Sequence, residues 1–151
     1  MTTSEDVVVP ADIIESLELL MFGAIGMTTL ALAAEATGEL TLPQWRALVV
    51  IGRGQDARVG EIAAAVGMTL PSASRLVRRL ENRGLVTTGP DEADRRATLV
   101  RMTAQGRQVR QEVVNRRRAM MEAALIAHAP SLPRDLVAGL AAIAGALAEY
   151  A

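Results

Sequence analysis

The chain has 151 residues, half of them apolar, which is enough for one domain with a sizeable core, or for one domain with an appended element. It has no cysteine, which excludes disulfides, thiolate catalysis, thiol-based redox sensing and cysteine-ligated zinc. The net charge of −1 hides an uneven distribution. Residues 1–40 carry seven acids and no base, whereas residues 69–118 carry twelve arginines against five acids, a net charge of +7. A basic region of this size indicates a polyanionic partner.

No segment of the sequence has the pattern of a signal peptide or of a membrane span. The apolar run at 19–34 follows acidic residues rather than the basic start of a signal peptide, and its 16 residues are short for a span. The apolar run at 136–148 is shorter still. We therefore expect both runs to be buried helices of a cytoplasmic protein without membrane contact.

The N-terminal part of the chain is predicted to be a flexible tail followed by a long helix. Residues 1–10 are polar or β-branched and end in a proline, which favours a tail without regular structure. Apolar residues then recur at helical spacing from Asp12 to about Thr37, and Gly38 is a suitable C-cap.

A second helix is predicted to begin just after Thr41, which can act as its N-cap. Its apolar face would contain Trp45, Leu48 and Val49. The sequence GRGQDAR at 52–58 is predicted to be a loop.

Residues 60–83 have the pattern of a helix-turn-helix. A short helix is predicted over roughly 60–66, and Gly67 permits the left-handed residue that ends it. Thr69 can cap a second helix over 70–83. Two helices joined by a three- to four-residue turn containing glycine form this motif. The predicted core positions are Val66, Leu76, Val77 and Leu80.

A β-hairpin is predicted to follow directly, which makes the motif a winged helix. The runs at 85–88 and 98–103 suit its two strands. A long helix is then expected over about 104–128 and a last helix over 132–150. The fold class is therefore mainly α with a small β-hairpin wing.

The tip of the predicted wing, DEADRR at 91–96, joins three acids to two arginines. A wing tip beside a recognition helix lies near the DNA backbone and the adjacent minor groove, whose negative potential attracts guanidinium groups. An acid at this place can hold an arginine through an ion pair. We expect Asp94 to have such a structural role, whereas Asp91 and Glu92 are equally well explained as solvated turn residues.

These segments resemble the MarR family of bacterial transcriptional regulators, continuously from about Leu40 to Arg107. The resemblance is carried by LTLPQWRALVVI, by VGEIAAAVGMTLPSASRLVRRLENRGLV and, most specifically, by the wing sequence DEADRRATLVRMTAQGR. It implies that residues 40–103 form a winged helix-turn-helix lobe and that 11–39 and 104–151 form the helices of a homodimer. It also implies binding of double-stranded DNA at pseudo-palindromic operators, usually as a repressor. In many members a small aromatic or apolar effector releases the DNA; no cofactor is implied.

By position, the resemblance assigns DNA contacts to the wing and to the second helix of the motif. Arg96 would enter the minor groove beside Arg95, with Asp94 orienting it. Because Arg78 and Arg79 are adjacent, we expect only one of them to face DNA, and we assign Arg78. The other expected DNA-binding residues are Thr69, Pro71, Ser72, Ser74 and Arg75.

Four apolar residues are candidates for an effector pocket, although a stripe of this kind is more often part of a core. They are Met21, Phe22, Met27 and Trp45.

Functions of other classes have less support. The sequence has no nucleophile–base set, phosphate-binding loop or helically spaced carboxylate pair, so we do not expect an enzyme. The single histidine, His128, is expected near a helix C-terminus without a metal-binding role. The alternative that stays open is a winged helix that binds another protein, which would bind DNA weakly and without sequence preference.

Overall fold

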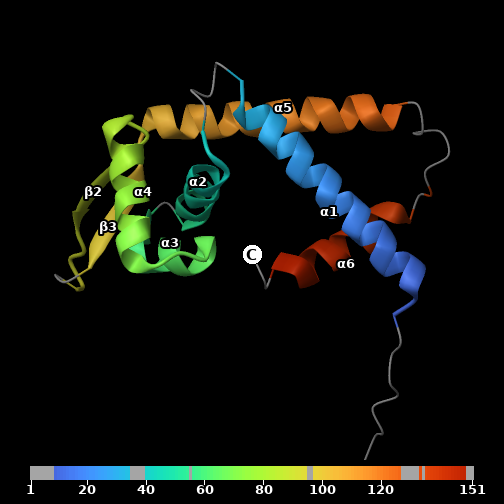
Figure 1. Ribbon diagram of the computed structural model, residues 1–151, viewed down its shortest axis with the longest axis horizontal. Coiled ribbons are helices and arrows are strands. Elements are labelled where there is room, and N and C mark those ends of the chain that lie inside the picture. Colours follow the sequence, from blue (N-terminus) through green and yellow to red (C-terminus); the bar gives the residue numbers. More distant parts are fainter. Residues whose placement is uncertain are drawn as a thin grey trace, which may run out of the picture.

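The computed structural model describes residues 9–34, 40–54, 56–94, 97–126, 133 and 135–148. Within these residues there are six helices and a small three-stranded sheet. Three of the helices and the sheet form a lobe at one end of a long helix, and the other two helices lie outside the lobe (Figure 1). The predicted class, mainly α with a small β-hairpin wing, is confirmed. The predictions for the 1–10 tail (apart from residues 9 and 10), Gly38, Arg95, Arg96 and His128 lie outside the described residues.

The lobe contains three helices and an antiparallel sheet. The helices are α2 (Leu42–Gly54), α3 (Val59–Val66) and α4 (Leu70–Asn82). The strands are β1 (Asp56–Arg58), β2 (Val86–Pro90) and β3 (Thr98–Met102), in the spatial order β1-β3-β2. The hairpin of β2 and β3 follows α4 directly, so the predicted winged helix is present.

The segment 52–58 was predicted to be a loop, and this prediction was wrong. Helix α2 continues to Gly54, and residues 56–58 form β1, which pairs with β3 so that Ala57 lies opposite Val100. Three residues are too few to show the alternation that identifies a strand. The strand exists because β3, far along the chain, supplies its hydrogen-bonding partner.

The core of the lobe is aliphatic and is centred on α4, which is strongly amphipathic. Leu76, Val77 and Leu80 are buried as predicted, and Val66 is half-buried against them. Burying a side chain of this size stabilises the fold by about 1.5–3 kcal/mol. The face of α4 opposite these residues is left to solvent.

Two glycines with left-handed backbone conformations end the helices of the motif. Gly67 has φ 72°, and its N–H and that of Met68 donate to the carbonyls of Ala64 and Ala63 at 3.2 and 2.9 Å. This pairing satisfies the last carbonyls of α3 and turns the chain into α4. Gly84, with φ 69°, occupies the same conformation after α4.

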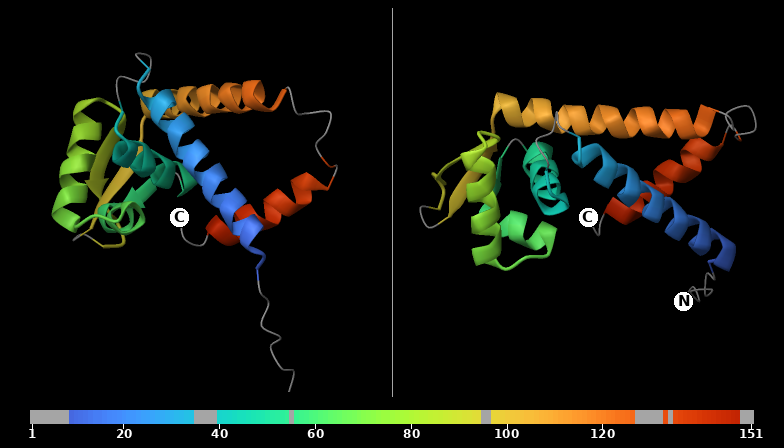
Figure 2. Two further views of the ribbon diagram at one scale, coloured as in Figure 1. Left: turned by 45° about the vertical axis from the view of Figure 1, so that its right-hand side comes forward. Right: turned by 45° about the horizontal axis from the view of Figure 1, so that its top comes forward.

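Three helices lie outside the lobe: α1 (Ala11–Leu32), α5 (Ala104–Ile126) and α6 (Leu136–Ala148). Helix α5 begins at the sheet, and α1 packs against α5. Helix α6 lies apart from α2, α3 and α4 in the views of Figures 1 and 2. Helix α1 ends at Leu32, earlier than the predicted Thr37. The alanine-rich sequence favours helix beyond this point, but Ala33 and Ala34 are a turn and a bend after the buried Leu32. Helix α6 likewise begins later than predicted, at Leu136.

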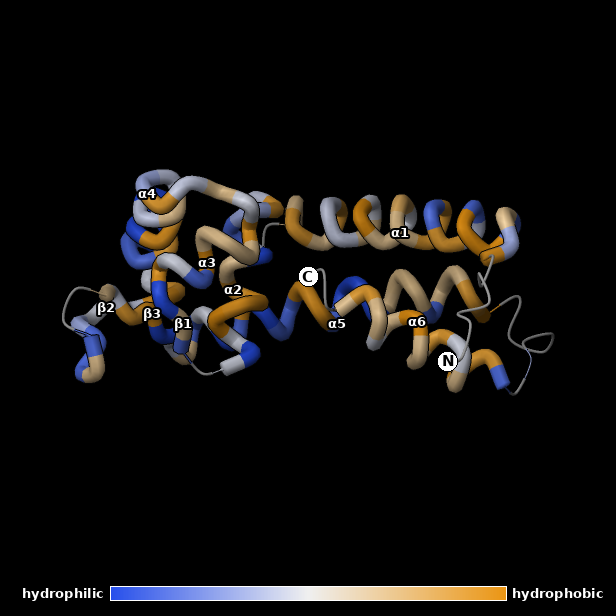
Figure 3. Tube along the Cα trace, turned by 90° about the horizontal axis from the view of Figure 1, so that it is seen from below, coloured by the Kyte–Doolittle hydropathy of each residue, from blue (hydrophilic) through white to orange (hydrophobic). Residues whose placement is uncertain are grey.

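The two apolar runs predicted to be buried form helices, but their side chains are largely exposed in the single chain. No described residue of α6 is buried, and α1 buries only Thr28, Ala31 and Leu32. Figure 3 shows hydrophobic residues along both helices. In the single chain the expectation that both helices are buried was wrong. The core of the lobe is complete without most of the side chains of α1 and α6. Among the described residues, α1 is the one helix long and apolar enough to cross a membrane by length and composition.

Candidate nucleic-acid interface

The exposed face of α4 presents hydroxyl and guanidinium groups. Ser74 donates a hydrogen bond to the carbonyl of Leu70 at 2.9 Å, and a terminal nitrogen of Arg75 donates to the hydroxyl of Ser72 at 3.1 Å. Pro71 is exposed in the first turn, where its missing N–H is tolerated. The structure thus places these sequence-predicted residues together on one solvent-facing surface.

Thr69 occupies the N-cap position of α4, with φ −70° and ψ 151°, as predicted. Its hydroxyl makes no side-chain cap and instead lies 3.1 Å from the hydroxyl of Ser72. The first N–H groups of α4 are therefore not occupied by the Thr69 side chain. Such groups at a helix N-terminus attract anions, including phosphate.

The adjacent residues Arg78 and Arg79 are both exposed but lie on different sides of α4. One helical turn separates Arg79 from Arg75, and both line a cavity of about 400 Å³ beside Thr41 and Gln44 at the start of α2. No acidic residue lines this cavity. Sequence reasoning could not distinguish the two arginines, because their difference depends on where α2 lies.

The start of α2 is fixed by a reciprocal pair of hydrogen bonds. The backbone N–H of Thr41 donates to the side-chain oxygen of Gln44 at 3.0 Å, and the N–H of Gln44 lies 3.4 Å from the Thr41 hydroxyl. This capping box confirms the predicted N-cap and sets the position of the cavity wall.

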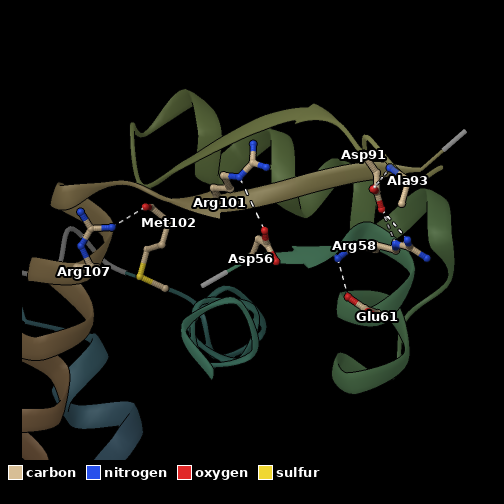
Figure 4. Close-up of polar contacts among 8 residues, drawn as sticks. All are labelled: Asp56, Arg58, Glu61, Asp91, Ala93, Arg101, Met102 and Arg107. Atoms are coloured by element: carbon tan, nitrogen blue, oxygen red, sulfur yellow. Dashed lines mark hydrogen bonds and ion pairs between the residues drawn. The ribbon is translucent and has the colours of Figure 1, made fainter. Parts of the chain in front are cut away.

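At the wing, Asp91 is tied to the rest of the lobe by an ion pair with Arg58. Asp91 is 8% exposed, and its Oδ2 accepts a hydrogen bond from Nε of Arg58 at 2.7 Å and lies 2.7 Å from Nη2 of the same guanidinium (Figure 4). Its Oδ1 accepts the N–H of Ala93 at 2.8 Å. The sequence explained Asp91 equally well as a solvated turn residue, and the structure corrects this. Arg58 lies 33 positions earlier, so only the fold brings the two residues together.

This environment lowers the pKa of Asp91 below its ordinary value of 3.8. The main cause is the hydrogen bond from the Ala93 N–H, with further lowering by Arg58, while burial acts in the opposite direction. The carboxylate is therefore ionised throughout the neutral pH range.

Asp94 lies in the turn of the wing, where its carbonyl accepts the N–H of Ala97 at 2.8 Å. It lines a cavity of about 470 Å³ between the wing and the start of α4, together with Leu70 and Ser74. Its proposed role in orienting Arg96 stays a prediction, because residues 95 and 96 lie outside the described part of the chain.

The outer edge of the wing is tied to α4 by a contact that sequence reasoning missed. One carboxylate oxygen of Glu81 accepts both the backbone N–H of Thr88, at 3.0 Å, and its hydroxyl, at 2.6 Å. Strand β2 is an edge strand, so this contact satisfies a donor that would otherwise face solvent.

The four candidate effector-pocket residues do not come together in the single chain. Trp45 is 4% exposed within the core, Phe22 is 80% exposed on α1, Met21 is also exposed and Met27 is half-buried. A separate apolar cavity of about 360 Å³ lies where α1 approaches α2 and is lined by other residues: Thr29, Leu32, Ala33, Leu40, Thr41 and Leu42. Across the described residues, no group of three or more His, Asp or Glu side chains could hold a metal ion.

An exposed basic helix in a helix-turn-helix, followed by a hairpin fastened to it, defines a winged-helix protein. Comparison with known proteins adds a likeness to one family. Residues 39–97 match the model of the MarR family.

Two curated relatives are transcriptional regulators. The activatory protein BadR of Rhodopseudomonas palustris is 40% identical over 80 residues, which are 51% of this chain and 45% of BadR. The repressor IacR of Pseudomonas putida is 33% identical over 70 residues, which are 46% of this chain and 42% of IacR. The matched segments thus span less than half the length of these two relatives.

Solved structures share the fold along nearly the whole chain. That of RV1404 from Mycobacterium tuberculosis has a TM-score of 0.77 at 24% identity and covers 92% of this chain and 95% of its own. That of CouR from Rhodococcus jostii RHA1, bound to p-coumaroyl-CoA, has a TM-score of 0.66 at 27% identity and covers 91% and 92%. The chain therefore has the winged-helix fold and is similar to the MarR family over residues 39–97, and the two curated relatives that match part of it are transcriptional regulators.

Proposed function

We propose that this protein regulates transcription by binding double-stranded DNA at pseudo-palindromic operators as a homodimer, acting as a repressor. The observation that carries the proposal is the exposed basic face of α4 beside a fastened wing. Because the relatives include both a repressor and an activator, the sign of regulation would follow from where the operator lies relative to the promoter.

In this proposal α4 enters the major groove. Ser74, Arg75 and Arg78 would face base edges and backbone, while Thr69 and Pro71 at the helix start lie near phosphate. The acid-free cavity between Arg79 and the start of α2 suits a DNA phosphate. Arg95 and Arg96 of the wing would reach the adjacent minor groove.

The exposed apolar surfaces of α1 and α6 support the dimer. Exposed large apolar side chains include Leu19, Leu20, Phe22 and Ile25 on α1 and Val137 and Leu140 on α6. A soluble protein seldom leaves so extensive an apolar surface in contact with water. A second copy of the chain would bury it and place the two α4 helices at half-sites about one helical turn apart.

An effector that releases DNA is a further part of the proposal. CouR, which has the same fold, was solved with p-coumaroyl-CoA bound. In this chain the apolar cavity between α1 and α2 lies at the junction of the lobe and the extending helices. A small apolar or aromatic molecule bound there would change the angle between these parts. Because DNA is the proposed target, we expect the protein to act in the cytoplasm.

The testing experiment is selection of bound duplexes from a random DNA pool by the purified protein at 100 mM salt. We expect an inverted repeat, with half-sites about 10 base pairs apart from centre to centre. If about 6–10 phosphates are contacted, affinity falls roughly 10³–10⁵-fold between 50 and 200 mM salt. Enrichment of no sequence would contradict the proposal and favour the alternative, a winged helix that binds another protein.

A further inference from the structure

The wing is anchored unevenly by apolar packing. At the end near α5, Val86 of β2 and both Val100 and Met102 of β3 are buried. At the other end, Pro90 and Thr98 are exposed. Packing therefore holds the base of the hairpin and leaves its outer end to other forces.

At that outer end the ion pair of Asp91 with Arg58 takes the place of apolar packing. Asp91 follows β2 directly, and its carboxylate is buried although its neighbours Glu92 and Ala93 are exposed. Nε and Nη2 of Arg58 both lie 2.7 Å from its Oδ2, and the N–H of Ala93 donates to its Oδ1 (Figure 4). Charged hydrogen bonds of this length are about twice as strong as neutral ones.

Arg58 is itself held in a fixed position. It is the last residue of β1, opposite Leu99 of β3, and it directly precedes α3. Its backbone N–H donates to the carboxylate of Glu61 at 2.7 Å. The ion pair therefore connects the outer end of the wing to the first helix of the helix-turn-helix.

Backbone hydrogen bonds also connect Asp91 to the turn of the wing. The N–H of Asp91 donates to the carbonyl of Ala97 at 3.2 Å, and the N–H of Ala97 donates to the carbonyl of Asp94 at 2.8 Å. These bonds couple the position of Asp91 to Asp94 and Ala97, the described residues on either side of 95 and 96.

We propose that Arg58 and Asp91 are positioning residues that hold the wing in its DNA-binding orientation before DNA arrives. This inference rests on the proposed function. A wing already held in place does not have to be ordered on binding, which would otherwise reduce affinity. Loss of the pair should lower affinity through the wing, while the core of the lobe stays intact.

A direct contact of Arg58 with phosphate is the rival explanation, since its side chain is 44% exposed. The two explanations differ in what they require of Asp91. A direct contact predicts that Asp91→Asn leaves binding unchanged or strengthens it, because an acid near the DNA is removed. Positioning predicts that Asp91→Asn and Arg58→Gln weaken binding alike and that the double variant is no weaker than either.

The experiment measures binding of the full chain to its selected duplex for these variants, with and without Arg96→Ala. We expect each single variant to bind about tenfold more weakly, a loss of about 1.4 kcal/mol, and we expect this loss to vanish in the Arg96→Ala background. Asp56→Asn is the matched control, because it removes an acid of the same sheet from a 3.8 Å exposed pair with Arg101. It should bind as the wild type does. Unchanged affinity of Asp91→Asn, or a loss that persists without Arg96, would overturn the proposal.

Amide hydrogen exchange without DNA separates this inference from the proposed function. In Arg58→Gln, exchange at Asp91 and Ala97 should become faster, while exchange in α4 stays at the wild-type rate. Wild-type exchange in this variant would overturn the positioning role alone. A wild-type protein that selects no duplex would overturn both the role in DNA binding and the proposed function.

Discussion

Replacing Gly106 by alanine should destabilise the joint between the lobe and α5. Gly106 is the third residue of α5, and its N–H donates to the hydroxyl of Thr103 at 3.0 Å. A Cβ at this position would overlap the backbone carbonyl of Leu85 and lie 2.8 Å from Cγ of Met102. The methionine can move, but the Leu85 carbonyl cannot easily do so, because it accepts the N–H and the hydroxyl of Thr103, each at 3.1 Å.

The size of the effect follows from two opposing contributions. Overpacking of a rigid site costs about 1–3 kcal/mol and sometimes more, and shifting the Leu85 carbonyl also weakens its hydrogen bonds, worth about 0.5–1.5 kcal/mol each. Alanine in place of glycine within a helix returns up to about 1 kcal/mol. We expect Gly106→Ala to lower the free energy of unfolding by about 2 kcal/mol.

The assay is urea unfolding followed by the fluorescence of Trp45, the single tryptophan of the chain, which is buried in the lobe. With a slope of about 2 kcal/mol per molar urea, the midpoint should fall by about 1 M. Protein concentration is kept constant, because association shifts the midpoint. Gly60→Ala is the control, since nothing lies within 4 Å of a Cβ there; it should be neutral or slightly stabilising. A midpoint for Gly106→Ala at or above that of the wild type would refute the steric argument.

Three further predictions concern binding, acid stability and assembly. Arg79→Ala should weaken binding to all duplexes alike and reduce the salt slope by about one, whereas Arg118→Ala, far along α5, should leave the slope unchanged in the same titration. The stabilisation from Asp91 should be complete above pH 3.8 and lost as pH falls through its lowered folded-state pKa; acid unfolding of Asp91→Asn should lack this dependence, and equal acid curves would contradict it. Phe22→Glu on α1 should shift the protein toward monomer in analytical ultracentrifugation, and an undisturbed dimer would exclude this surface from the interface.

The helix-turn-helix and the hairpin could be predicted because their signals are local. Gly67 is suited to the left-handed residue between α3 and α4, and the spacing of Leu76 and Leu80 fits a single buried face. Such signals lie within one or two helical turns of the residues that they determine. The same locality explains why Thr41 could be identified as an N-cap.

The candidate site was predictable only in part, because its side-chain contacts join residues that are distant in sequence. The ion pair of Asp91 depends on Arg58, which lies 33 positions earlier in the sequence. Likewise, Arg78 and Arg79 differ only once α2 lies beside one of them. An ion pair between distant residues leaves no periodic pattern, so the sequence left the role of Asp91 open.

The sequence by itself determined the elements of the winged helix and the basic character of its exposed helix. Helical periodicity, glycine at a left-handed turn and clustered arginines are properties of neighbouring residues. The tertiary structure decided that residues 56–58 are a strand, that Asp91 fastens the wing and that α1 and α6 leave apolar surfaces uncovered. Each of these depends on which distant surface a residue meets, and it is the packing of the whole chain that selects that surface.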